Sequence, residues 1–192
     1  RILFCFLFAT LFGHASDAQE PGAGFSNTLG MKFAPVPGTT VLFAVNETRV
    51  SDYEAMLKGG SYEWTFKPHF EQGGDHPVVG INLQDALAFC NWLTQTEREQ
   101  GRIKPNQGYR LPTNTEWSAA AGLSAERKED VSTEERLQET MKFPWGAQWP
   151  PPVMVANLQE KEIEGYTDGF PFTAPVGSFQ PSPEGLNDVS GN

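Results

Sequence analysis

The nine residues Tyr109-Arg110-Leu111-Pro112-Thr113-Asn114-Thr115-Glu116-Trp117 predict an extended segment that a proline closes and a helix follows at once. We expect the Thr113 hydroxyl to cap this helix and the Glu116 carboxylate to reach back to the main-chain amide of Thr113. The reciprocal pair satisfies two donors that a helix start otherwise leaves unpaired, and losing the cap would cost ~1 kcal/mol. The stretch therefore predicts a rigid corner.

Residues 82–101, which precede the corner, predict the longest helix. Asn82 suits an N-cap, and Asp85 lies where the helix dipole stabilises a negative charge. Gly101 ends the pattern. One stripe is predicted to be buried, with Cys90 in it as a small hydrophobe, and its members are Leu83, Ala86, Leu87, Cys90 and Leu93.

A shorter helix is predicted nearer the N-terminus. Ser51 and Glu54 form a second possible capping box, and Gly59-Gly60 would end the helix. Residues 41–45 are apolar throughout, which indicates a buried strand. Short helices, scattered short strands and much loop predict a mixed α+β fold.

Composition limits the class of protein. The chain of 192 residues fits one domain, and its 19 glycines, 15 prolines and five tryptophans indicate a loop-rich fold pinned by aromatic side chains. The net charge of −10 argues against nucleic acid or an anionic membrane as a partner.

An apolar run near the start predicts a targeting segment. Residues 2–12 are too short for an ordinary membrane span, and the small residues Ala15, Ser16 and Ala18 follow them. We interpret residues 1–18 as a partial signal peptide, residues 19–26 as a flexible leader and residues 27–192 as the domain. The expected location is periplasmic or extracellular, with no membrane attachment after signal removal. An uncleaved anchor is the alternative.

Cysteine and histidine offer little metal chemistry. Cleavage near Ala18 would leave Cys90 alone, so neither an internal disulfide nor a cysteine pair for copper or redox chemistry could form. His69 and His76 lie seven residues apart in a glycine-rich loop, a spacing without a metal signature. Structural or solvated roles are expected for both.

The charged stretch 126–139 predicts a surface insertion.

Acidic residues gather near the C-terminal end. Residues 157–192 hold six acids and one base, Lys161, within a loop rich in glycine and proline. Such carboxylates repel one another unless they are solvated or bridged by a cation. Calcium is the natural bridge, since it takes oxygen ligands from irregular backbone. A solvated acidic loop is the alternative. The acids are Glu160, Glu162, Glu164, Asp168, Glu184 and Asp188.

Five motifs in order resemble the formylglycine-generating, sulfatase-modifying-factor family. Its members carry AFCNWL, YRLPTEAEWE, PWG, TAPVGSF and GLYDMSGN. This chain has AFCNWL at 88–93, YRLPTNTEW at 109–117, PWG at 144–146, TAPVGSF at 173–179 and GLNDVSGN at 185–192. Asn187 stands where an aromatic residue is usual. The resemblance runs from about Asn27 to Asn192.

The resemblance implies a fold, a reaction and a partner. The expected fold is the irregular, C-type-lectin-like α+β fold of the family. The family reaction oxidises a cysteine of an unfolded, sulfatase-type polypeptide to formylglycine with oxygen and with copper held by two thiolates. We expect those two cysteines beyond Asn192, so the chain is interpreted as a fragment, and no catalytic residue is assigned within it.

The resemblance also implies a structural calcium site. The matching positions are the side chains of Asn157 and Asp168 and the carbonyls of Leu158 and Phe170. Asn192 matches the asparagine that starts a second calcium site in some relatives.

Two other functions stay open. A non-catalytic binding or scaffolding module of the same fold is the main alternative, because many family members lack the cysteine pair. Oxygen-dependent chemistry at non-haem iron is a third, disfavoured by the histidine spacing.

Overall fold

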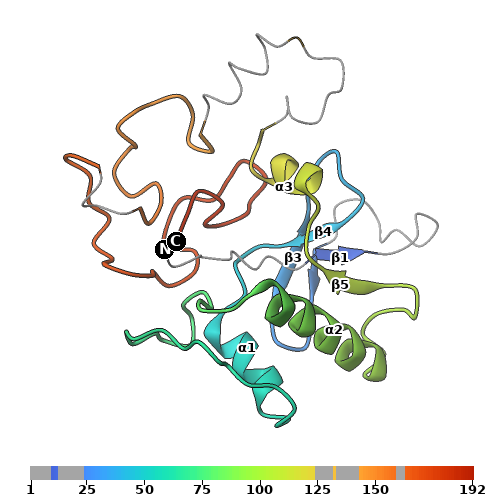
Figure 1. The fold of residues 1–192 in the computed structure, drawn as a ribbon. Helices are drawn as coiled ribbons and strands as arrows, with labels where there is room; N and C mark the ends of the chain where they lie inside the picture. Colours follow the sequence, from blue (N-terminus) through green and yellow to red (C-terminus); the bar gives the residue numbers. More distant parts are fainter. Residues whose placement is uncertain (1–9, 13–23, 124–131, 133–142, 159–162) are drawn as a thin grey trace.

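The computed structural model of the chain describes residues 10–12, 24–123, 132, 143–158 and 163–192 (Figure 1). Its centre is a sheet with the strand order β2-β3-β4-β1-β5 and antiparallel pairing throughout. The strands are β1 (Thr10–Phe12), β2 (Phe25–Ser26), β3 (Lys32–Pro35), β4 (Leu42–Ala44) and β5 (Gly108–Arg110).

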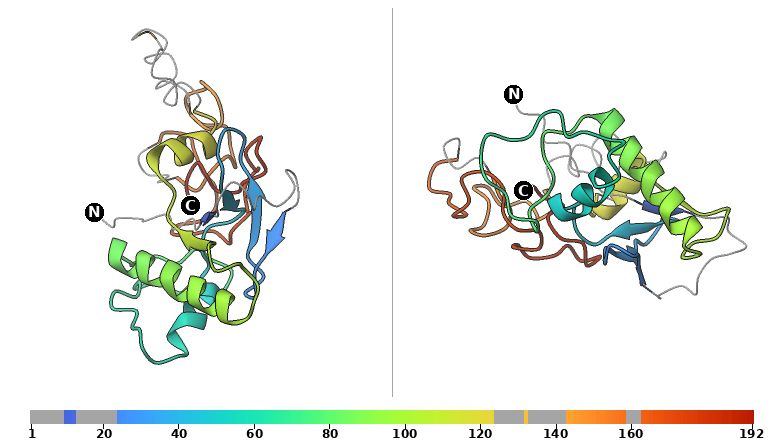
Figure 2. Two further views of the ribbon diagram at one scale, coloured as in Figure 1. Left: turned by 90° about the vertical axis from the view of Figure 1, so that its right-hand side faces the viewer. Right: turned by 90° about the horizontal axis from the view of Figure 1, so that it is seen from below.

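The described residues form three helices, which lie on the two faces of this sheet: α1 (Val50–Leu57), α2 (Leu83–Glu99) and α3 (Asn114–Ala120). In Figure 1 and the left view of Figure 2 the strands lie between α3 above and α2 below. The described residues after 142 form loops without a helix or a strand. The predicted mixed α+β fold, with short strands and much ordered loop, is confirmed.

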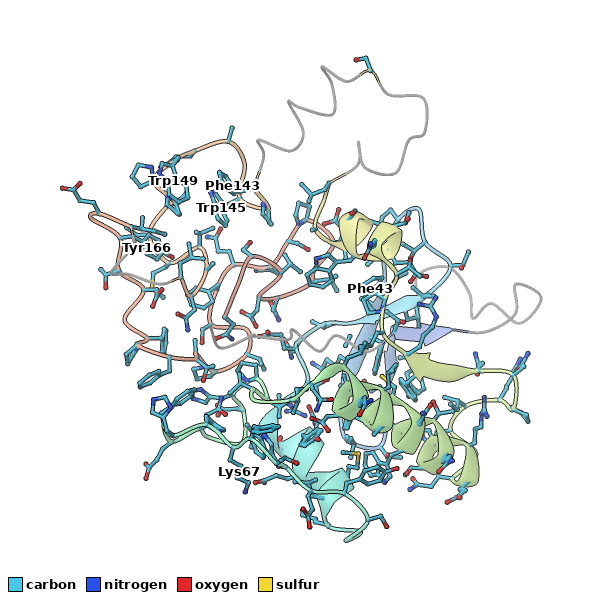
Figure 3. The ribbon with its side chains drawn as sticks, viewed as in Figure 1. Phe43, Lys67, Phe143, Trp145, Trp149 and Tyr166 are labelled. Atoms are coloured by element: carbon cyan, nitrogen blue, oxygen red, sulfur yellow. The ribbon has the colours of Figure 1, made fainter. Side chains whose placement is uncertain are left out.

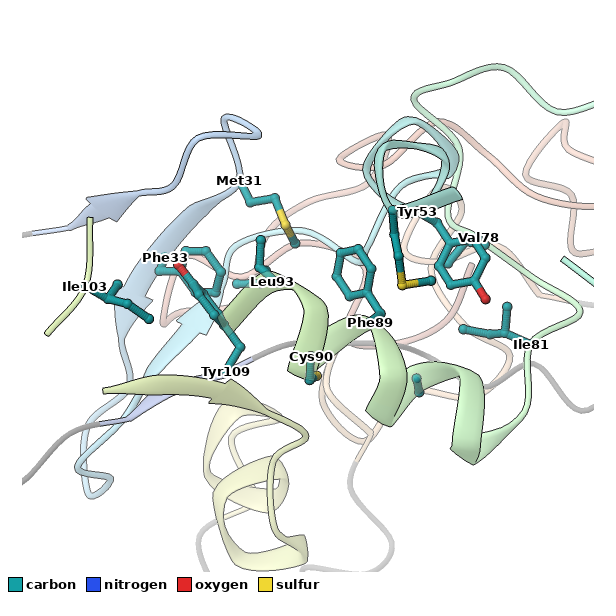
Figure 4. Packing of buried hydrophobic residues seen from close by; sticks show 13 residues of the cluster. Met31, Phe33, Tyr53, Val78, Ile81, Phe89, Cys90, Leu93, Ile103 and Tyr109 are labelled. Carbon is teal, nitrogen blue, oxygen red and sulfur yellow. The ribbon is translucent and has the colours of Figure 1, made fainter. Parts of the chain in front are cut away.

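The two faces of the sheet carry two cores. Phe33 and Ala44 pair across β3 and β4 and face α1 and α2, whereas the adjacent pair Ala34 and Phe43 faces α3. This follows from the alternation of side chains along a strand. Figure 4 shows the first core, in which rings of the sheet and of both helices pack together. Its largest fully buried members include Phe33, Tyr53, Phe89 and Leu93.

The predicted corner is confirmed. The Thr113 hydroxyl accepts the Glu116 amide at 3.3 Å, and Glu116 Oε2 accepts the Thr113 amide at 2.7 Å. The same carboxylate takes two bonds from the Arg110 guanidinium, at 2.6 and 2.7 Å. These bonds lower the pKa of Glu116 to about 2, and the bonds from Arg110 have the largest effect. One carboxylate therefore joins the end of β5 to the start of α3.

We expect Glu116→Gln to lower the free energy of unfolding by roughly 2 kcal/mol at pH 7, a value that allows for partial exposure of the Arg110 guanidinium. Because the pKa of Glu116 is depressed, its contribution is full above about pH 4.5 and is lost as the pH falls toward 2. Urea unfolding of both proteins at pH 7 and pH 2.5 measures this. A difference that is equal at the two pH values would contradict it.

The start of α1 differs from the prediction. The helix begins at Val50 and its N-cap is Arg49, so the Ser51–Glu54 box is wrong. The reason is Asp52, which accepts the Arg49 amide at 3.0 Å and pairs with the Arg49 guanidinium at 2.8 Å. Asp52 is 3% exposed, so this tertiary environment overrides the local pattern.

The cap of α2 is confirmed, but part of its buried stripe is wrong. Asn82 Oδ1 accepts two amides, and Asp85 bonds back to the Asn82 amide. Leu83 and Leu87 are 59% and 44% exposed, while Phe89 is fully buried. The contact face of α2 is turned toward Phe89 because the α1 core lies on that side.

Residues before the predicted domain also join the sheet. Thr10–Phe12, within the predicted signal peptide, pair with β4 and β5, and the Thr10 hydroxyl donates to the Arg110 carbonyl at 2.9 Å. Phe25–Ser26, within the predicted leader, form β2. Cleavage stays a prediction. The insertion predicted at 126–139 lies outside the described residues except for Ser132. In the described parts of the chain no helix is both long and apolar enough to cross a membrane.

Candidate functional site

The loops after residue 142 bring together the residues predicted to bind calcium. Asp168 is 4% exposed; its Oδ2 accepts the Leu158 amide at 2.8 Å and its Oδ1 accepts the Phe170 amide at 2.9 Å. A carboxylate has further lone pairs beyond these two bonds. Asp168 thus lies against both segments whose carbonyls were predicted as ligands.

Asn157 ties the same place to the end of the described chain. Its Nδ2 donates to the Phe172 carbonyl at 2.7 Å and to Asn192 Oδ1 at 3.4 Å. Asn192, 6% exposed, bonds through both side-chain atoms to the main chain of Ala174. Two loops and the GLNDVSGN segment therefore meet at one point.

The donor set has the chemistry that calcium requires. One carboxylate, one side-chain amide and the carbonyls of Leu158 and Phe170 supply oxygen atoms, the hard ligands that Ca²⁺ takes. These residues fit the predicted ion, and its binding remains a prediction.

A second acidic site, formed by two buried carboxylates, was not predicted from the sequence. Glu47 and Asp188 are 3% and 4% exposed, and Glu47 Oε2 and Asp188 Oδ1 have no hydrogen-bond partner among the described residues. The chain segments that carry Glu47 and Asp188 are joined by two hydrogen bonds. The Asn187 amide donates to the Val45 carbonyl at 2.8 Å, and the Asn187 side chain donates to Asn46 Oδ1 at 2.6 Å. An acid two residues after the apolar run 41–45 was the available signal.

Burial changes the protonation of both acids. It raises the pKa of Glu47 well above the ordinary value, and the charge of Asp188 adds to this while Asn192 opposes it. Burial raises the pKa of Asp188 to about 6, against the bond that its Oδ2 accepts from the Gly177 amide. Glu47 also lines a cavity of about 320 Å³ together with Asn46 and Asn187. The pair is suited to hold a cation or a proton.

The sequence model of the family described as "Sulfatase-modifying factor enzyme 1-like domain" matches residues 25–192. The chain belongs to this family. The match begins two residues before the predicted domain start at Asn27, where β2 begins the pairing with β3.

Relatives of this sulfatase-modifying-factor chain include formylglycine-generating enzymes and a protein described as inactive. Formylglycine-generating enzymes of Thermomonospora curvata and Bos taurus are 31% identical over 193 residues and 33% identical over 122 residues, covering 96% and 62% of this chain. The inactive C-alpha-formylglycine-generating enzyme 2 of Bos taurus is 30% identical over 124 residues, or 62% of the chain. The alignments cover 52%, 25% and 31% of these relatives, so the chain spans about half of their length or less.

The fold has a solved counterpart. The structure of PvdO from Pseudomonas aeruginosa superposes with a TM-score of 0.58 over 91% of this chain and 73% of that chain, at 18% identity. At this identity the likeness concerns the fold alone.

Cys90, His69 and His76 of this sulfatase-modifying-factor domain lie in packing and hydrogen-bonding contacts. Cys90 is 1% exposed, and burial raises the pKa of its thiol to about 12, so it is a poor thiolate donor. His76 Nδ1 lies 2.9 Å from the Thr173 hydroxyl. The His69 ring contacts Phe70 and Phe172 edge-on. The expected packing role of Cys90 is confirmed.

Proposed function

We propose that the chain is part of an exported sulfatase-modifying-factor protein that oxidises a cysteine of a sulfatase-type polypeptide to formylglycine. The family match over residues 25–192 carries the proposal, and the formylglycine-generating enzymes among the relatives support the reaction class. The predicted signal peptide supports a periplasmic or extracellular location.

Copper would supply the oxygen chemistry in this family reaction. The described residues do not fit a copper site, because soft copper(I) needs a thiolate pair and Cys90 is buried and protonated. The two cysteines within residues 1–192 are Cys5 and Cys90. We therefore propose that this part of the protein supplies the scaffold.

We further propose that calcium stabilises the scaffold. Asn157 and Asp168 would bind the ion through side-chain oxygens, and Leu158 and Phe170 through carbonyls. In the structure both carboxylate oxygens of Asp168 contact these segments, which supports the assignment. A second cation would lie between Glu47 and Asp188, where burial leaves two carboxylate oxygens without donors among the described residues.

A non-catalytic binding or scaffolding module is the second candidate. One observation favours it: the inactive C-alpha-formylglycine-generating enzyme 2 of Bos taurus is 30% identical over 124 residues, close to the 33% over 122 residues of the Bos taurus formylglycine-generating enzyme.

Conversion of a substrate peptide distinguishes the two. The full-length protein is loaded with copper(I) and incubated in air with a cysteine-containing sulfatase peptide and with the same peptide carrying serine. The enzyme proposal predicts an aldehyde by mass spectrometry in the cysteine peptide alone. No aldehyde, with the protein folded and copper bound, would contradict the enzyme proposal and leave the module.

A further inference from the structure

The first half of α2 is apolar on the side turned away from its buried face. Leu83 and Leu87 are 59% and 44% exposed and lie one helical turn apart. Phe66 is 64% exposed, and its carbonyl oxygen lies so close to Gly80, three residues before α2, that a Cβ there would clash. We call Phe66, Leu83 and Leu87 the apolar patch. Exposed apolar side chains that gather in this way mark interaction sites.

The charges near α2 separate into an acidic end and a basic end. Residues 61–87 contain four acids and one base, Lys67, whose Nζ lies 5.3 Å from the centroid of the Trp64 ring (Figure 3). Residues 91–107 contain three bases and two acids, of which Glu97 is fully buried. The apolar patch therefore lies at the acidic end. The four acids are Glu63, Glu71, Asp75 and Asp85, and the three bases are Arg98, Arg102 and Lys104.

A surface with this order of charge is complementary to a second copy of itself. A two-fold axis that crosses α2 near Leu87 would make the α2 helices of two copies antiparallel. The apolar patches of both copies then meet at the axis, and the basic end of each helix lies over the acidic end of the other copy. A parallel arrangement would bring like charges together, so the charges favour the antiparallel one.

The position of α2 leaves room for such a partner. In both views of Figure 2, α2 lies at the edge of the molecule, and the described loops after residue 142 lie on another part of it. The outer side of α2 carries exposed polar residues beyond the apolar patch, among them Asn91 and Arg98. These polar residues would form the rim of an interface with an apolar centre.

We propose that two copies of this chain form a homodimer through the apolar patch, with their α2 helices antiparallel. The apolar centre is small, so we expect a reversible dimer with a dissociation constant of roughly 10 µM and not an obligate one. The dimer would leave the loops around Asp168 accessible. This inference goes beyond the proposed reaction and does not depend on it.

Sedimentation velocity of the full-length protein over a range of protein concentrations tests the proposal. We expect monomer to give way to dimer as the concentration rises, and the midpoint to move to higher concentration when NaCl is added. A protein that stays monomeric up to about 200 µM would overturn the proposal. Growth beyond the dimer would overturn it too, because a two-fold contact closes on two copies.

A charge at the axis locates the interface. Leu87→Arg brings two like charges together in the dimer and should raise the dissociation constant at least about tenfold. Val153→Arg is the matched control: Val153 is 66% exposed, lies in the loop 143–158 and gains the same charge. Equal effects of the two substitutions, in variants with unchanged thermal unfolding, would refute the interface.

Charge reversal tests the antiparallel arrangement. Glu71 and Lys104 are exposed and belong to opposite ends. Glu71→Lys and Lys104→Glu should each weaken the dimer about three- to tenfold, and the double variant should recover most of the loss, because opposite charges face each other again. Losses that simply add in the double variant would contradict the antiparallel dimer.

Discussion

Calcium at about 100 times its dissociation constant should raise the unfolding midpoint of the full-length protein by roughly 5–10 °C over the midpoint in chelator. An ion that binds only the folded state at this excess adds about 2.7 kcal/mol, and a domain of this size shifts by about 2–4 °C per kcal/mol. We expect Asp168→Asn to lose most of this response, because the variant lacks the carboxylate at the centre of the predicted ligand set. Differential scanning calorimetry with and without calcium measures it.

The response to calcium is the diagnostic quantity, because the amide that Asp168→Asn introduces would also weaken the bonds to the Leu158 and Phe170 main chain. Glu164→Gln is the matched control: it removes an exposed acid of the same loop region and should keep the full response. If NaCl at equal ionic strength raises the midpoint as much as calcium does, the region is a solvated acidic loop and the calcium proposal is wrong.

In chelator, the free energy of unfolding should fall by roughly 2 kcal/mol between pH 4 and pH 7 because of Asp188. Its pKa rises from 3.8 to about 6 on folding, so the folded state holds the proton more tightly. Stability is then greatest below the unfolded pKa and is lost as the pH rises through the folded one. Glu47, whose pKa is also raised, acts in the same direction. Urea unfolding at pH intervals measures the fall.

Asp188→Asn isolates the effect. Asp188 has φ of +59°, and asparagine tolerates this left-handed conformation, so the substitution removes the charge with little change of backbone. The variant should gain stability over the parent at pH 7 in chelator and match it near pH 4. Glu116 does not interfere with this difference, because its contribution is the same in the variant and in the parent. A difference between variant and parent that is independent of pH would contradict the account.

Local rules predicted the elements whose stabilising contacts lie within a few residues. The Thr113–Glu116 and Asn82–Asp85 caps involve neighbours three residues apart, and both are present. The apolar run 41–45 correctly predicted β4. These contacts form whatever packs around them, so the sequence alone was sufficient.

Contacts between distant segments could not be predicted in the same way. Leu87 is exposed because the core beside α2 is built from Phe89 and from Tyr53, which lies on α1. The segments of Glu47 and Asp188 meet through a bond that spans 141 residues of chain, and periodicity carries no information about that meeting. The neighbourhood of Asn157 and Asp168 was predicted from family motifs, not from the pattern of acids.

Calcium bound by these residues would hold the loops of the scaffold together, and a crystal structure of the full-length protein grown with CaCl₂ would show the ion. We expect an ion with calcium's anomalous signal bound to Asn157, Asp168 and the carbonyls of Leu158 and Phe170 at about 2.3–2.6 Å. Water in that place, with Asp168 bonded to main-chain amides and to no ion, would contradict it.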